Sequence, residues 1–153
     1  MKFFFISFLF FTLDTVSKYI VNLKLMVGDI VEITTFLNLV NYKNTGFIFG
    51  IFSEIPYMLY LILNIFLFII VLYIILKLYF ENSRLLIPLS LITGGGIGNL
   101  IERFFYHGVT DFIDIYYKSY HWPAFNFADL FISSGIIIFI LLNVTENRNC
   151  SQA

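Results

Sequence analysis

The stretch YMLYLILNIFLFIIVLYIIL, residues 57–76, decides the class of fold. Asn64 is its only strongly polar member, and a helix of about 20 apolar residues is long enough to cross the hydrocarbon core of a bilayer. The rest of the chain has the same character. Only 12% of its 153 residues are charged, against about 25% in an ordinary soluble domain. There is too little polar side chain to coat a water-soluble globule, so the sequence predicts a membrane protein.

Three further runs are long and apolar enough to span, at about residues 3–23, 85–101 and 124–144. The first run follows Lys2 and resembles a secretory signal peptide, but no small-x-small cleavage site comes after it. We expect it to be a retained helix. The sequence thus predicts an α-helical membrane protein with four transmembrane helices and no separate second domain, so that residues 1–153 form a single domain.

Four spans place both termini on one side of the membrane. The connector at 77–84 on that side is short, and it carries Lys77 and Arg84 while the termini carry Lys2 and Arg148. Because short cytoplasmic segments are enriched in Lys and Arg, we expect both termini to be cytoplasmic. The longer loops, at about 24–56 and 102–123, then lie outside.

Both outer loops contain segments typical of strands. IVEITTFLNLV, residues 30–40, is rich in β-branched residues and precedes the polar stretch NYKNTG, which predicts strands that end in a turn. DFIDIYY, residues 111–117, has the same character. We expect the two loops to build one small extracytoplasmic β element on the outer face of the membrane.

Composition also excludes several kinds of partner and chemistry. A net charge of −1 without a basic stripe argues against binding nucleic acid. Cys150 is the only cysteine, so the chain has no internal disulfide and no cysteine metal cluster. There is no HExxH motif, and His107 and His121 lack the i, i+4 spacing of helical zinc ligands. We expect neither a metal nor another cofactor.

Ionisable residues inside a span are functional-site hypotheses, because their burial in lipid is costly. Asp14 and Lys18 lie four residues apart and share one helix face. Mutual neutralisation that merely makes the helix insertable is an alternative that stays open. In GGGIGNLIERF, residues 94–104, Gly94 and Gly98 favour close helix packing. Asn99 in the same span needs a hydrogen-bond partner.

Three aspartates lie near the outer ends of the spans. Asp111 and Asp114 point to opposite faces if their segment is extended, and Asp114 alone is most simply a solvated loop charge. Asp129 begins the fourth helix, where either it or Asn126 could cap the N-terminus. Two carboxylates held together in a low dielectric cannot both ionise, so such a pair supplies one acid and one base and can activate a water molecule without a metal.

Five motifs together carry a resemblance to a known family. DTVSK (14–18), NTGFIFG (44–50), GGGIGNLIERF (94–104), GVTDFIDI (108–115) and FNFAD (125–129) occur in the order and at the spacing of lipoprotein signal peptidase, also called signal peptidase II. The resemblance implies an intramembrane aspartic peptidase of the bacterial inner membrane. Its substrates would be diacylglyceryl-modified prolipoproteins, cut just before the lipidated cysteine. It also implies four helices with an outer β-cradle and an active site near the outer face.

The resemblance also assigns residues. It makes Asp111 and Asp129 the catalytic pair. Residues expected to line or brace the site are Asp14, Lys18, Asn44, Gly46, Gly95, Gly98, Asn99, Arg103, Asn126 and Ala128. The sequence departs from the family at Glu102, where Asp is usual, and at the bulky pair Phe47 and Ile48, which could narrow the cleft. We expect prolipoprotein substrates and membrane lipid as the partners, and a monomer.

Two other functions remain possible from the residues alone. A small ion-coupled transporter could use Asp14, Lys18 and Asp129 as a relay, although four spans without an internal repeat are few for a transporter. A structural subunit could use the same polar groups to hold its helices together. That interpretation predicts that Asp111 and Asp129 tolerate Asn with losses of stability only.

Overall fold

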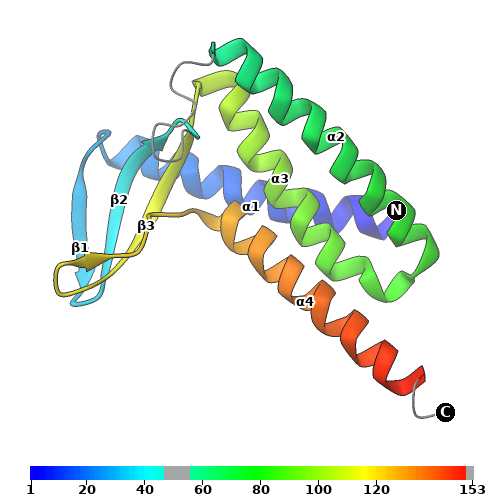
Figure 1. Cartoon of the computed structure of the whole chain (residues 1–153). Coiled ribbons are helices and arrows are strands. Elements are labelled where there is room, and N and C mark those ends of the chain that lie inside the picture. The colour runs from blue at the N-terminus through cyan, green and yellow to red at the C-terminus, as the bar shows by residue number, and fades with distance from the viewer. Residues whose placement is uncertain (47–55, 151–153) are drawn as a thin grey trace.

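Four long helices dominate the computed structural model, which describes residues 1–46 and 56–150 (Figure 1). They are α1 (Lys2–Lys24), α2 (Tyr57–Glu81), α3 (Leu86–Tyr106) and α4 (Phe127–Cys150), with a 3₁₀ turn, η2 (Ser83–Leu85), before α3. Each contains a segment long and apolar enough to cross a membrane. Apolar side chains such as Ile62 and Phe66 of α2 are exposed on the helix surface, as expected where lipid is the solvent. The prediction of four membrane-spanning helices is confirmed.

Several helix boundaries differ from the predicted spans. Helix α2 runs on to Glu81 and α4 runs on to Cys150. The third helix does not end at residue 101 but runs to Tyr106, so Glu102 and Arg103 belong to the helix and not to the following loop. The helix stops at His107, whose φ of 58° is left-handed and cannot continue it. The fourth helix begins at Phe127 and not at residue 124. Pro123 and the capping residue Asn126 precede it.

A four-stranded sheet lies at one end of the helices (Figure 1). Its strands are β1 (Ile30–Thr34), β2 (Leu37–Asn44), β3 (Val109–Tyr117) and β4 (Tyr120–His121), and each pairs antiparallel with the next. The pairing of β2 with β3 joins the two loops into one sheet, as predicted. As predicted, the strand region ends within the polar stretch at 41–46, because β2 stops at Asn44 and the chain bends at Gly46. The reversal between Thr34 and Leu37, which divides the run at 30–40 into two strands, was not predicted.

Helix α3 packs against each of the other three helices, and small residues let it approach closely. A Cβ atom added at Gly94 would overlap the backbone oxygen of Ser7 on α1, and one at Gly95 would overlap that of Ala128 on α4. The packing prediction for Gly94 is therefore confirmed. A hydrophobic cluster of Phe3, Ile75, Leu85 and Leu89 fills the end of the bundle away from the sheet, where α1 begins and α4 ends.

Candidate active site

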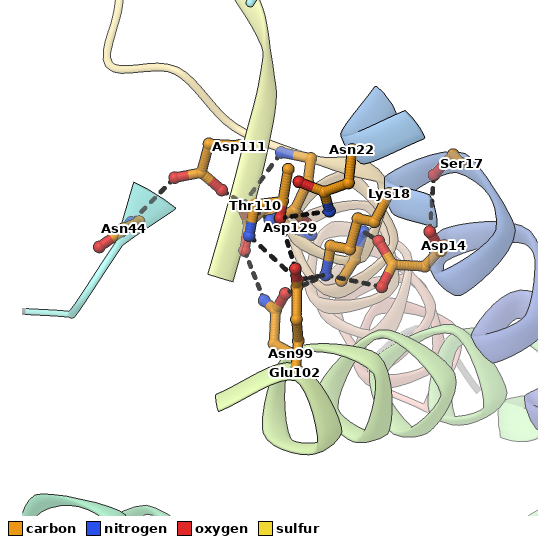
Figure 2. Close-up of polar contacts among 12 residues, drawn as sticks. Asp14, Ser17, Lys18, Asn22, Asn44, Asn99, Glu102, Thr110, Asp111 and Asp129 are labelled. Atoms are coloured by element: carbon orange, nitrogen blue, oxygen red, sulfur yellow. Dashed lines mark hydrogen bonds and ion pairs between the residues drawn. The ribbon is translucent and has the colours of Figure 1, made fainter. Parts of the chain in front are cut away.

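The end of the bundle next to the sheet is polar inside. Charged and amide side chains from α1, α3, α4, β2 and β3, most of them buried, converge there (Figure 2). Asp111 comes from β3 and Asp129 from the first turn of α4. The fold thus brings together motifs that are far apart in the sequence.

Asn126 connects the two aspartates. Its side-chain nitrogen donates to Oδ1 of Asp111 at 2.7 Å, and its backbone nitrogen donates to Oδ2 of Asp129 at 3.3 Å. Its side-chain oxygen accepts from the backbone nitrogen of Asp129 at 3.0 Å. Asn126 is therefore the N-cap of α4. The Asp129 side chain in turn accepts from the Asn126 backbone nitrogen, as in a capping box. The cap that the sequence left open is Asn126, which leaves Oδ1 of Asp129 for other partners.

Asp111 is 3% exposed and accepts a hydrogen bond on each oxygen. Oδ1 takes the bond from Asn126, and Oδ2 takes one from Nδ2 of Asn44 at 2.9 Å. Burial raises the pKa of Asp111 to about 6, the nearby charge of Asp129 adds to this effect, and the two amide donors oppose it. At about pH 6, Asp111 can therefore carry a proton that an ordinary aspartate would have lost.

Gly46 fixes the direction of the Asn44 amide. Its backbone nitrogen donates to Oδ1 of Asn44 at 2.8 Å, so the NH₂ group of Asn44 must point toward Asp111. Gly46 has a φ of 82°, and a Cβ atom there would collide with the ring hydroxyl of Tyr60. Both conditions require glycine.

Asp129 is partly exposed, and its second oxygen is held from α3. Oδ1 accepts from Nδ2 of Asn99 at 2.8 Å, and Oδ1 of Asn99 in turn accepts from Nζ of Lys18 at 2.7 Å. Asn99 was predicted to need a hydrogen-bond partner. Its amide has two, the Asp129 carboxylate for its NH₂ group and the Lys18 ammonium for its oxygen.

The predicted pair on α1 forms, with 2.7 Å between Nζ of Lys18 and Oδ2 of Asp14. Its contacts go beyond mutual neutralisation. Oδ1 of Asp14 accepts from the backbone nitrogen of Ala128 at 2.8 Å, directly before Asp129. A Cβ atom at Gly98 would overlap the Asp14 carboxylate, so this glycine makes room for it.

Glu102 is a buried site residue that the sequence analysis treated only as a departure from the family. Its Oε2 accepts from the backbone nitrogen of Thr110 at 3.0 Å, and its Oε1 accepts from the Thr110 hydroxyl. Nζ of Lys43 lies 3.2 Å from Oε1, and Nζ of Lys18 lies 3.4 Å from Oε2. The signal was present in the sequence, because Glu102 follows Asn99 by three residues and so shares its helix face.

Arg103 and Asp114 lie away from this cluster. The backbone oxygen of Arg103 accepts from the Tyr57 hydroxyl and from the backbone nitrogen of His107. The prediction that Asp114 is a solvated loop charge is wrong, because its side chain is only 3% exposed. It is buried because it accepts from Nδ2 of Asn38 at 2.8 Å and pairs with Nδ1 of His121 at 2.9 Å. Phe47 and Ile48 lie outside the described residues.

The cluster offers acid–base chemistry. Within residues 1–46 and 56–150, no group of three or more His, Cys, Asp or Glu side chains is arranged to hold a metal ion. Two carboxylates of different burial share one bridging asparagine, and each has a further amide donor that orients it. Such a pair can bind one proton between them and polarise a water molecule.

Comparison with known proteins gives a consistent result. A family model for signal peptidase (SPase) II matches residues 6–145. The lipoprotein signal peptidase of Thermodesulfovibrio yellowstonii is 38% identical over 139 residues, which cover 91% of this chain and 92% of that protein. That of Blochmanniella pennsylvanica is 36% identical over 141 residues, covering 90% of this chain and 86% of that protein.

Solved structures also resemble the chain. Two, each described as a bacterial membrane enzyme, align with TM-scores of 0.77 and 0.76 at 29% and 31% identity. They cover 96% and 92% of this chain, and 90% of each solved chain is covered in turn.

Proposed function

The chain belongs to the signal peptidase II family of membrane proteases, and on that premise we propose that it is an aspartic endopeptidase whose catalytic pair is Asp111 and Asp129. Its substrates are diacylglyceryl-modified bacterial prolipoproteins, cut just before the lipidated cysteine. The chemistry needs no cofactor. Asp14, Lys18, Asn44, Gly46, Gly95, Gly98, Asn99, Asn126 and Ala128 support the pair. Arg103 braces α3 against α2 through its backbone oxygen.

The observation that carries this proposal is the bridge made by Asn126. A single side chain and its own backbone nitrogen contact both carboxylates, although Asp111 and Asp129 come from a strand and a helix. Asn44 and Asn99 complete the set, so within the described part of the chain the two carboxylates accept their hydrogen bonds from side-chain amides and a backbone nitrogen.

The pair holds one proton in the active form. Burial favours that proton on Asp111, while the less buried Asp129 is the base. Asp129 takes a proton from water as the water oxygen attacks the scissile carbonyl carbon, and Asp111 gives its proton to the carbonyl oxygen. When the C–N bond breaks, the proton on Asp129 passes to the leaving nitrogen and Asp111 regains its own from the collapsing hydroxyl.

The arrangement in the membrane follows from the same residues. Strand β3, which carries Asp111, and the first turn of α4, which carries Asp129, lie at the end of the bundle opposite the start of α1 and the end of α4 (Figure 1). With both termini in the cytoplasm, the site lies near the outer face of the inner membrane and the sheet is extracytoplasmic. Residues 1–153 act as a single peptidase domain and as a monomer. Acyl chains of the substrate lie in lipid between helices, and their binding energy positions the peptide bond.

A direct assay tests the proposal. The protein, purified in detergent, is mixed with a diacylglyceryl-modified prolipoprotein in EDTA, and release of the signal peptide is followed by gel shift and mass spectrometry. Wild type should release a peptide that ends directly before the modified cysteine, and Asp111→Asn should release none. Asp114→Asn is the matched control, because Asp114 is equally buried in the same strand. No cleavage by folded wild type, or near-normal cleavage by Asp111→Asn, would refute the proposal.

A further inference from the structure

The ammonium group of Lys18 lies at the junction of the polar cluster (Figure 2). Lys18 is 3% exposed, and its Nζ lies 2.7 Å from Oδ2 of Asp14, 2.7 Å from Oδ1 of Asn99 and 3.4 Å from Oε2 of Glu102. An ammonium has three N–H donors and no acceptor. The Asn99 oxygen accepts a hydrogen bond from it, and the carboxylates of Asp14 and Glu102 form ion pairs with it.

One branch from Lys18 leads to Asp129. Because an ammonium can only donate, the oxygen of the Asn99 amide must face Lys18. The NH₂ group of Asn99 must then face Asp129, which accepts it at 2.8 Å. The direction of the amide, and through it the position of the Asp129 carboxylate, is set by Lys18.

Two further branches reach the backbone beside each aspartate. Through Glu102, Lys18 connects to the backbone nitrogen of Thr110, the residue before Asp111. Through Asp14, it connects to the backbone nitrogen of Ala128, the residue before Asp129. The same ammonium is therefore linked to the backbone beside both aspartates through short chains of polar contacts.

We propose that Lys18 is a positioning residue that ties both aspartates to one buried ammonium, and so fixes their relative geometry and their shared proton. This inference rests on the function proposed above. Lys18 acts on the pair through its contacts with Asn99, Glu102 and Asp14. Its charge also favours ionisation of the pair, since it lowers the pKa of Asp111 against the opposing effects of burial and of Asp129.

A cavity beside Lys18 makes a chemical-rescue experiment possible. It has a volume of about 400 Å³ and lies between α1 and α3, and its lining includes Lys18, Gly98, Ile101 and Glu102. Lys18→Ala removes three methylenes and the ammonium, which is the composition of n-propylammonium. The cavity offers this small cation a path to the vacated position.

The expected result is a loss of rate that the amine restores. Lys18→Ala should lower kcat by about 100-fold or more, with KM changed by less than about threefold, because misplaced catalytic groups cost rate more than binding. Added n-propylammonium should raise kcat at least about tenfold, with saturation. Neither 1-propanol, which lacks the charge, nor tetramethylammonium, which lacks N–H donors, should do so. Lys77→Ala, which changes an exposed lysine on α2, should keep the wild-type rate and ignore the amine. A kcat within about threefold of wild type, or equal rescue by all three additives, would overturn the proposal.

A second measurement does not depend on cleavage. The infrared carboxyl band that disappears in Asp111→Asn is titrated in wild type and in Lys18→Ala. The groups that face Asp111 are Asp129, Asn44 and Asn126, and Asp14 and Glu102 face Lys18. The midpoint should move to higher pH in Lys18→Ala, and an unchanged or lower midpoint would overturn the inference.

The two arms separate the two claims. If wild type does not cut prolipoprotein, the proposed function fails, whereas the infrared midpoint still decides whether Lys18 is coupled to the pair. If Lys18→Ala does not fold, the charge-balanced variant Asp14→Asn/Lys18→Met replaces it in both arms. That variant should show the same loss of kcat, and full activity in it would overturn the positioning role.

Discussion

Replacing Asp111 with Asn should make stability less dependent on pH, by an amount that the structure sets. The pKa of Asp111 is raised from 3.8 to about 6, chiefly by burial. Below pH 3.8 the carboxyl is protonated in both the folded and the unfolded state. Between 3.8 and about 6 the unfolded chain has lost the proton while the folded chain keeps it. The folded state binds more protons there, so the stability of wild type falls as pH rises.

The size of the fall follows from the same numbers. The interval from 3.8 to about 6, at about 1.4 kcal/mol per pH unit, gives a loss on the order of 3 kcal/mol. Asn does not titrate, so the variant lacks this loss. It has a separate cost, because its NH₂ group must face one of two donors, Asn44 or Asn126, whose oxygens are already used by Gly46 and by the backbone of Asp129. That cost is about 1–3 kcal/mol and does not change with pH.

The assay is the free energy of unfolding of both proteins in mixed micelles, measured between pH 4 and pH 8. The difference between Asp111→Asn and wild type should change by on the order of 3 kcal/mol in favour of the variant as pH rises through 6. The change with pH isolates the buried carboxyl from the constant cost of the lost hydrogen bond. A difference that stays flat, or that moves in favour of wild type, would refute the reasoning.

Three further substitutions test other contacts. Asn126→Ala removes the N-cap of α4 and the bridge to both aspartates, so unfolding free energy should fall by about 1 kcal/mol and kcat by about 100-fold; a rate above a third of wild type would contradict this. Gly98→Ala pushes a methyl group against the Asp14 carboxylate and should lower the free energy of unfolding by about 1–3 kcal/mol. An unchanged unfolding midpoint would contradict this, because it would mean that α1 moves away without loss of stability. Asp114→Ala leaves the donors Asn38 and His121 without their acceptor and should cost about 1–3 kcal/mol with kcat within a few-fold of wild type; loss of kcat without loss of stability would contradict the structural role.

Hydrophobicity predicts the helices well, because lipid imposes one requirement on every span. The run at 57–76 could be recognised by length and composition alone, and it lies within α2. Boundaries were harder. The extension of α3 to Tyr106 depends on where the backbone of His107 turns left-handed, which no apolar count reveals. The reversal between Thr34 and Leu37, which divides the run at 30–40 into β1 and β2, likewise could not be recognised from the β-branched composition of that run.

The candidate site was predictable as a set of residues but not as a network. The family motifs named Asp14, Lys18, Asn99 and Asn126, and the structure brings all four into one cluster. Which of them contact each other depends on tertiary packing. Asp114 shows the limit, because it was predicted to be a solvated loop charge and is instead buried against Asn38 of another strand.

The central claim, that Asp111 and Asp129 act as one unit, is tested most directly by a kinetic cycle. Turnover of diacylglyceryl-modified prolipoprotein is measured for wild type, Asp111→Asn, Asp129→Asn and the double variant, all in EDTA and with folding checked. If the two carboxylates share one proton and one water, each single change should abolish nearly all turnover and the double variant should be no slower than either. Losses that multiply in the double variant would mean that the residues act independently, and would contradict the shared-proton pair.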